Sequence, residues 1–132
     1  MGLKETPVES RVERKKEAVK EKVIAVAMRL FKEQGVDATT MEQIAREVDI
    51  AKGTLYNHFP VKEAIISEFM KRSFSEKNSG RIRELRRIPD TRSRVTLIFG
   101  ELIEGIQANR DIFEKYMVYR MQSIVSFSQE DS

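Results

Sequence analysis

The segment from Ala51 to Phe59, AKGTLYNHF, gathers polar side chains of the kinds that bind nucleic acids. If this segment is helical, its outward-facing polar residues are Lys52, Thr54, Asn57 and His58, with Tyr56 beside them. Ammonium and hydroxyl groups donate to phosphate oxygens, and an asparagine amide can form paired hydrogen bonds with a base edge in the major groove. Leu55 and Phe59 lie on the opposite face, where they can anchor the helix to its neighbours.

Two short predicted helices and a tight turn position these side chains. Ile44, Ala45 and Val48 share one face of a predicted helix over 41–48, and a second helix follows over 51–58. The proline at position 60 ends that helix, because the residue before a proline is pushed out of helical geometry. A longer helix precedes the pair, so the arrangement predicts a helix-turn-helix.

Two hydroxyl residues compete for the cap of the first short helix. Thr39 with Glu42 and Thr40 with Gln43 both have a hydroxyl three residues before an acid or amide, which is the capping-box pattern. The sequence leaves this choice open. In the turn between the helices, Asp49 is a residue that tolerates left-handed backbone better than most.

Helical periodicity extends over nearly the whole chain, so we predict an all-α fold. We expect a first helix over 12–34 and a fourth that starts near Val61 and bends or stops between 76 and 80. Two further helices follow residues 89–90 and 109–111. We assign 1–62 to an N-terminal arm and the helix-turn-helix domain, and 63–132 to a partial helical effector-binding and dimerisation domain.

The composition excludes most of the common kinds of catalytic and metal-binding site. The 132 residues include no cysteine and one histidine, His58. Disulfides, thiolate metal sites, histidine clusters and cysteine nucleophiles are therefore excluded. We expect no enzyme activity, no metal and no cofactor. No apolar run approaches the roughly 18 to 20 residues that span a bilayer.

Residues 22–69 resemble the TetR family of bacterial one-component regulators. The resemblance rests on paired and clustered residues at fixed spacing: Leu30-Phe31, Gly35, Thr39-Thr40, Ile44-Ala45, Gly53-Thr54-Leu55-Tyr56, His58-Phe59-Pro60 and Lys62-Glu63-Ala64. It implies a cytoplasmic bacterial regulator, most simply a repressor, that binds a palindromic operator in double-stranded DNA as a homodimer. A small-molecule effector would release the DNA by favouring another spacing of the two reading helices.

The resemblance also implies roles by position. It places nine residues against DNA: Thr39, Thr40, Lys52, Gly53, Thr54, Tyr56, Asn57, His58 and Lys62. Thr40 and Lys62, each at the start of a helix, would bind phosphates. The helix over 51–58 would lie in the major groove, where the missing side chain at Gly53 lets the backbone come close.

Three positions depart from the commonest family pattern. Asp49 stands where glycine is usual, Ala51 where serine is usual, and Val61 where a small polar residue is usual. The last two each lose a helix cap worth about 1 kcal/mol.

The C-terminal half contains the candidate effector residues. They are Phe99, Ile103, Phe113, Tyr116 and Met117, for which ordinary core packing is the alternative interpretation. Family chains continue for several more helices, so we expect this domain to be partial. Apolar surface would then be exposed at Met121, Ile124 and Phe127, and dimerisation would be weak or non-standard.

Two other interpretations of the chain stay open from the residues alone. A helical protein-interaction module that never meets DNA would share the same periodicity, and an enzyme has no nucleophile and base to support it. The segment from Arg81 to Arg94 contains six arginines and two acids. These arginines form either a solvated rim or a surface that contacts DNA or an acidic partner. Lys52 and Lys62 could be plain solvated lysines, and Tyr56 a half-buried core aromatic.

Overall fold

The computed structural model describes the backbone of residues 7–130 and the side chains of 10–75, 80 and 82–126. Within that range helices are the only regular secondary structure, which confirms the all-α prediction. In chain order they are α1 (Pro7–Gln34), α2 (Met41–Val48), α3 (Lys52–His58), α4 (Lys62–Arg87), α5 (Thr91–Ala108) and α6 (Arg110–Glu130). None of the helices in the described part is both long and apolar enough to cross a membrane.

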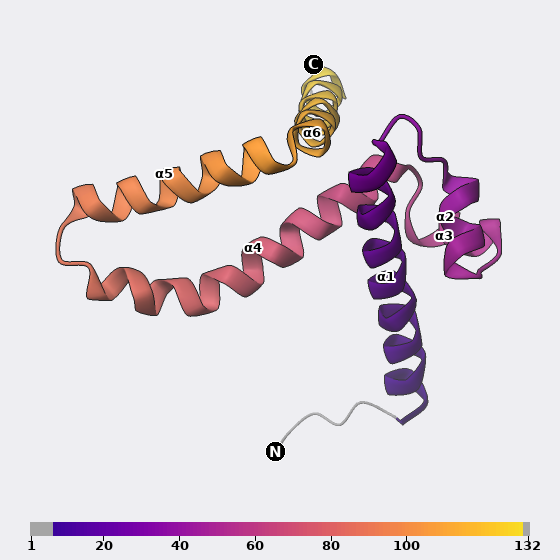
Figure 1. Cartoon of the computed structure of the whole chain (residues 1–132). Coiled ribbons are helices and arrows are strands. Elements are labelled where there is room, and N and C mark those ends of the chain that lie inside the picture. The colour runs from indigo at the N-terminus through magenta and orange to yellow at the C-terminus, as the bar shows by residue number, and fades with distance from the viewer. Residues whose placement is uncertain (1–6, 131–132) are drawn as a thin grey trace.

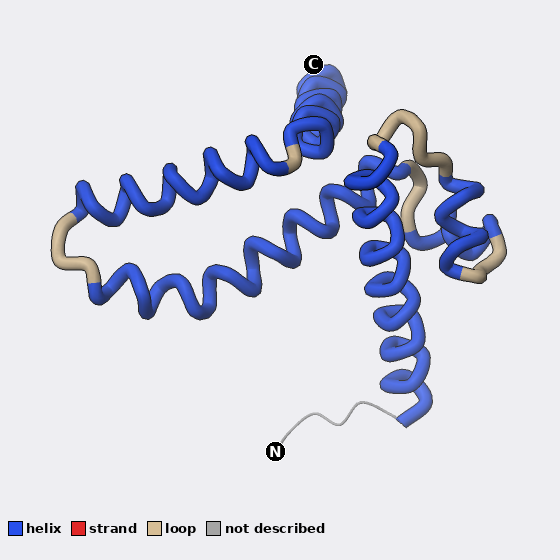
Figure 2. The backbone as a smooth tube through the Cα atoms, in the orientation of Figure 1, coloured by secondary structure: helices blue, strands red, loops and turns tan. Residues whose placement is uncertain are grey.

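The helices form a head and an arm (Figure 1). α1 packs against α2 and α4, and α2 packs against α3. We call α1, α2, α3 and the start of α4 the head, and the rest of α4 with α5 and α6 the arm. α4 leads away from the head to a short turn, and α5 returns toward it (Figure 2). α6 contacts both α4 and α5 where they approach α1. The two short helices therefore lie at the opposite end of the molecule from the α4–α5 turn.

The hydrophobic core lies inside the head. Its fully or almost fully buried members include Val23, Ala27, Leu30 and Phe31 of α1, Ile44 and Val48 of α2, Leu55 of α3, Ile65 and Ile66 of α4, and Ile112 of α6. The core therefore continues past residue 62, where we placed the domain boundary, and recruits one residue of α6. This continuity ties the start of α4 and of α6 to the short helices.

The open choice of cap is decided in favour of Thr40. Its Oγ1 accepts a hydrogen bond from the Gln43 backbone N–H at 3.1 Å, so it satisfies a donor that the first turn of α2 leaves free. Asp49 ends α2 in left-handed geometry at φ 65°, as expected from its tolerance of that region. Gly35 ends α1 at φ +90°, which a residue with a Cβ rarely adopts.

Three helix limits differ from the sequence prediction. α1 begins at Pro7 instead of residue 12, and a proline is well suited to a first helical position because its missing N–H is not needed there. α3 begins at Lys52, with Ala51 as an N-cap that makes no side-chain hydrogen bond. The predicted stop between 76 and 80 is wrong, since α4 runs through to Arg87. A residue of low helix propensity costs only about 1 kcal/mol, which a long helix tolerates.

We expect Val23→Ala to lower the free energy of unfolding by about 1.5 to 3 kcal/mol, because two buried methyl groups are replaced by a cavity. Val23 is fully buried, whereas Val12 on the same helix is 46% exposed. Val12→Ala is therefore the matched control and should change stability by less than about 0.5 kcal/mol. Urea unfolding followed by circular dichroism measures both. Equal losses in the two variants would contradict the position of the core.

Candidate nucleic-acid interface

The outer face of α3 presents a row of polar side chains to solvent. Its exposed members are Lys52, Gly53, Thr54, Tyr56 and Asn57, and His58 is half-buried. Leu55 is fully buried and Phe59 almost so, so the expected division of the two faces is confirmed. The buried face fixes the helix on the head, and the exposed face is free to meet a partner.

A shallow depression of about 270 Å³ lies beside this row, between the start of α2 and the start of α4. Thr40, Tyr56 and Lys62 all line it, together with Pro60 and Val61. Thr40 and Lys62, the two residues expected to bind phosphate, therefore share one surface feature with Tyr56, although the three come from different elements.

Lys62 uses much of its hydrogen-bonding capacity inside the protein. Its Nζ donates to the Val36 carbonyl oxygen at 2.6 Å and to the Thr39 carbonyl oxygen at 2.9 Å. An ammonium group has three donors, so one remains beyond these two bonds. The expectation that Lys62 is free to bind phosphate therefore needs revision, because this lysine first of all holds the loop between α1 and α2.

Thr39 lies in the same loop and differs even more from the role against DNA that the resemblance implies. The residue is fully buried. Its hydroxyl donates to the Gly35 carbonyl at 2.8 Å and accepts from the Gln34 side-chain amide at 3.1 Å. A side chain without exposed surface offers nothing to DNA, so Thr39 has a structural role, and Thr40 is the one of the pair that reaches solvent.

The first turns of α6 hold this loop from its other side. The Val36 backbone N–H donates to Asp111 Oδ2 at 3.0 Å. Lys115 forms an ion pair with Asp37 at 3.0 Å, and the hydrogen bond to that carboxylate raises the pKa of Lys115. The loop over 35–39 is thus bound by both α4 and α6. No spacing pattern could have indicated Asp111, because 75 residues separate it from its partner.

An ion pair joins the two short helices on the exposed face. Lys52 Nζ lies 2.8 Å from Glu42 Oε1. This hydrogen bond is the main reason why the pKa of Glu42 is lowered and that of Lys52 is raised. Both groups are therefore charged at neutral pH. In the sequence, Glu42 is recognisable only as part of a capping pattern, because a turn of irregular backbone separates it from Lys52.

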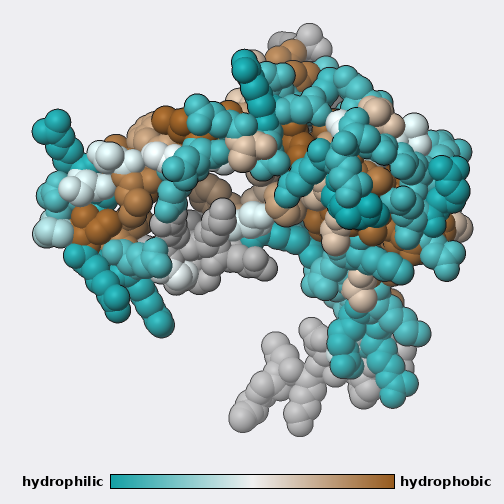
Figure 3. Space-filling view, viewed as in Figure 1, coloured by the Kyte–Doolittle hydropathy of each residue, from teal (hydrophilic) through white to brown (hydrophobic). Residues whose placement is uncertain are grey.

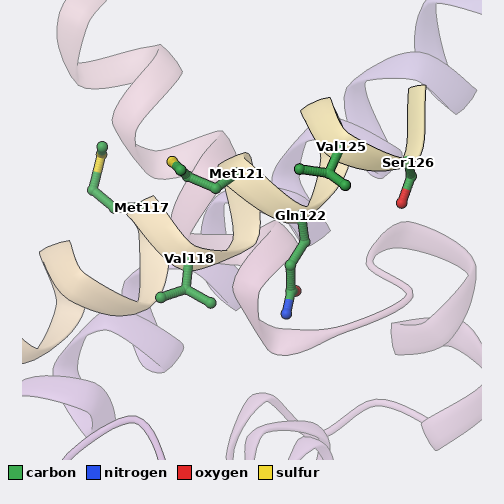
Figure 4. A pocket seen from close by; sticks show the side chains of 6 residues that line it. All are labelled: Met117, Val118, Met121, Gln122, Val125 and Ser126. Atoms are coloured by element: carbon green, nitrogen blue, oxygen red, sulfur yellow. The ribbon is translucent and has the colours of Figure 1, made fainter. Parts of the chain in front are cut away.

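The candidate effector residues are not gathered into one cavity. Phe113 and Tyr116 are half-buried with ring centroids 6.4 Å apart, while Phe99 and Ile103 lie exposed on α5. Met117 lines an open groove of about 530 Å³ formed by side chains of α6 (Figure 4). Figure 3 shows apolar side chains gathered along α5.

Exposed apolar surface continues toward the end of α6. Met121 and Ile124 are 58% and 60% exposed, as expected, whereas the side chain of Phe127 lies outside the described residues.

The arginine-rich segment lies far from α3. Its described arginines flank the α4–α5 turn, at the opposite end of the molecule from the short helices (Figure 1). The side chain of Arg81 lies outside the described residues. This separation disfavours a contact with the same stretch of DNA. Among the described residues no cluster of histidine and acidic side chains could hold a metal ion.

Comparison with known proteins identifies relatives of the head. Residues 23–69 match the sequence profile of bacterial regulatory proteins of the tetR family. The HTH-type negative transcriptional regulator IcaR of the biofilm operon icaADBC, from Staphylococcus aureus, is 41% identical over 61 residues, which are 46% of this chain and 33% of IcaR. The uncharacterized HTH-type transcriptional regulator YerO of Bacillus subtilis is 47% identical over 47 residues, 36% of this chain and 16% of YerO. The match to these curated relatives thus spans a third of their length or less.

A solved structure extends the similarity beyond the head. The crystal structure of Thermus thermophilus FadR, a TetR-family transcriptional repressor in complex with lauroyl-CoA, aligns with a TM-score of 0.64 at 26% identity. The alignment covers 71% of this chain and 48% of FadR. Most of this chain therefore has a helical arrangement similar to about half of that repressor.

We expect Lys62→Met to lower the free energy of unfolding by about 1 to 3 kcal/mol, because the Val36 and Thr39 carbonyls lose a charged donor. Lys71→Met, at an exposed position of the same helix, removes the same charge and should have little effect. Chemical unfolding of both variants measures the difference. A Lys62 variant as stable as the Lys71 variant would show that the loop does not depend on this lysine.

Proposed function

We propose that the chain is a sequence-specific DNA-binding repressor of transcription, a function supported by the match of residues 23–69 to bacterial regulatory proteins of the tetR family. The single observation that supports this most strongly is the polar row of α3, exposed above the buried anchor Leu55. Helices of this size fit the major groove of B-DNA, where each base pair presents its own pattern of donors and acceptors.

In the proposed complex α3 lies in the major groove. Thr54 and Asn57 approach base edges, and the backbone at Gly53 comes close because glycine has no side chain at this open position, where nothing lies within 4 Å of a Cβ. Thr40 and Tyr56 bind phosphates through their hydroxyl groups beside the shallow depression that Lys62 also lines. Phosphate contacts supply affinity and set the register, and base contacts supply specificity.

Repression is the direction of control that the relatives support. IcaR is named a negative transcriptional regulator and FadR a transcriptional repressor. A repressor needs only to occupy its operator tightly, which requires no additional surface for a polymerase. The site of action is then the cytoplasm, where bacterial DNA lies.

We further propose that the arm binds a small apolar effector and a second copy of the chain. The support is the exposed apolar surface of α5 and α6, since a patch of this kind marks a binding surface. Asp111 and Lys115 connect α6 directly to the loop over 35–39. A shift of α6 on effector binding would therefore reach the start of α2 and α4 and change how α3 is presented.

Selection of bound duplexes from a random pool tests the proposal and yields the operator. We expect a palindrome and a steep fall of affinity with salt, because phosphate contacts release counterions. A protein-interaction module would instead show neither sequence preference nor binding to the pool. That outcome would remove the proposed function.

Two substitutions on α3 should separate base contacts from phosphate contacts. Asn57→Ala should cost about 1 to 3 kcal/mol at the operator and relax preference at one base pair. Tyr56→Phe should weaken binding to operator and unrelated duplexes alike, by about three- to tenfold for each, since only a phosphate hydrogen bond is lost. Gln122→Ala, an amide on α6, is the matched control for Asn57. Unchanged operator binding in both α3 variants would contradict the placement of α3.

A further inference from the structure

The ion pair between Glu42 and Lys52 lies on the face proposed to meet DNA. Glu42 is in the first turn of α2, and Lys52 is the first residue of α3. Their side chains retain about half of their accessible surface, 49% and 56%, and the two charged atoms are 2.8 Å apart. Glu42 also lines the depression that contains Thr40 and Tyr56. A fixed negative charge therefore stands among groups that would bind a polyanion.

This charge is unfavourable for simple attraction to DNA. Affinity for any duplex, whatever its sequence, comes mainly from lysines and arginines that neutralise phosphates. An ammonium group has three donors, so Lys52 could hold the carboxylate and a phosphate together, but the carboxylate then neutralises its charge. The lysine must leave that partner before it can neutralise a phosphate. The carboxylate is then left unpaired beside the negatively charged backbone.

Stability of the helix pair does not require this interaction. An exposed ion pair contributes little to folding, because water screens it and two long side chains lose freedom. The two helices are already joined through the buried side chains of Ile44, Val48 and Leu55. What distinguishes this pair from other exposed pairs is its place beside Thr40 and Tyr56, where DNA is proposed to lie.

We propose that Glu42 is a specificity-determining residue, which lowers affinity for non-cognate DNA by holding Lys52 away from phosphates. This inference rests on the proposed function. On a non-cognate duplex the pair must break for a phosphate contact that carries no sequence information. On a matching base pair Lys52 can donate to guanine O6 and N7 while the carboxylate accepts from cytosine N4, so both charges keep a partner. The penalty therefore falls more heavily on the wrong sequence.

The chain offers a closely matched control. Glu47 lies on the same helix and forms an exposed ion pair with Arg29 of α1, 3.0 Å apart. Glu42→Gln and Glu47→Gln each remove one acid of an exposed pair and raise the net charge from +3 to +4. A general effect of net charge would appear equally in both variants, whereas release of Lys52 would appear only in the first.

The experiment measures binding of the full chain to a fluorescent duplex of scrambled sequence by anisotropy, over a series of salt concentrations. We expect Glu42→Gln to bind this duplex about three- to tenfold more tightly at 0.1 M salt, with a salt slope steeper by about 0.9 per chain, the value for one added phosphate contact. The ratio of operator to scrambled affinity should fall. Glu47→Gln should match the wild type, and thermal melts should show that both variants are folded.

A second background isolates the role of the lysine. In a Lys52→Gln chain, the further change Glu42→Gln should tighten binding to the scrambled duplex much less than it does in the wild-type background. No ammonium remains to be released there, and only the repulsion by the carboxylate is removed. Persistence of the full effect would show that Glu42 acts by repulsion alone and would overturn the masking mechanism. Equal effects of the Glu42 and Glu47 variants would overturn it too.

Failure of the inference can be told apart from failure of the proposed function. If the wild type binds its selected operator with steep salt dependence but Glu42→Gln changes neither affinity nor slope on scrambled DNA, the inference alone is wrong. If the wild type binds neither duplex, the proposed function itself is wrong.

Discussion

The arrangement of the head depends on how the loop over 35–39 is held, because this loop sets the start of α2 relative to α1. Lys62 binds two of its carbonyls from α4, and Asp111 binds the Val36 N–H from α6. Thr39 closes the loop on itself through its buried hydroxyl. Backbone groups that are buried without partners are costly, so these contacts satisfy the loop and fix its path at the same time.

The held loop explains how one short helix can be presented precisely enough to distinguish sequences. α3 has only seven residues and would not be stable in isolation. Leu55 and Phe59 anchor it in a core that α1, α2, α4 and α6 share, so its exposed row inherits the rigidity of the larger helices. The same connections link the arm physically to the surface proposed to face DNA, since α6 contributes both Ile112 to the core and Asp111 to the loop.

Charge on the proposed interface is balanced. The face contains Lys52 and Lys62, yet each already has partners within the protein: a carboxylate for the first and two carbonyls for the second. A surface built only for attraction would leave such groups free. In the proposed complex, partial engagement would lower affinity for DNA in general and leave discrimination to groups such as Asn57, as a regulator among many competing sites requires.

Most of the helices, the helix-turn-helix, the outward row of α3 and the tolerance of Asp49 for a left-handed turn could be predicted from the residues alone. These follow from apolar periodicity and turn chemistry, which act over a few residues. The sequence left Thr39 and Thr40 equivalent, since both match the same capping pattern, and it missed the partners of Lys62, Glu42 and Asp111. Only the tertiary structure decided these, because a lysine or carboxylate looks the same in the sequence whether it faces solvent or a group 26 or 75 residues away. Such contacts depend on where the packing of the core places each helix, and no local pattern contains that information.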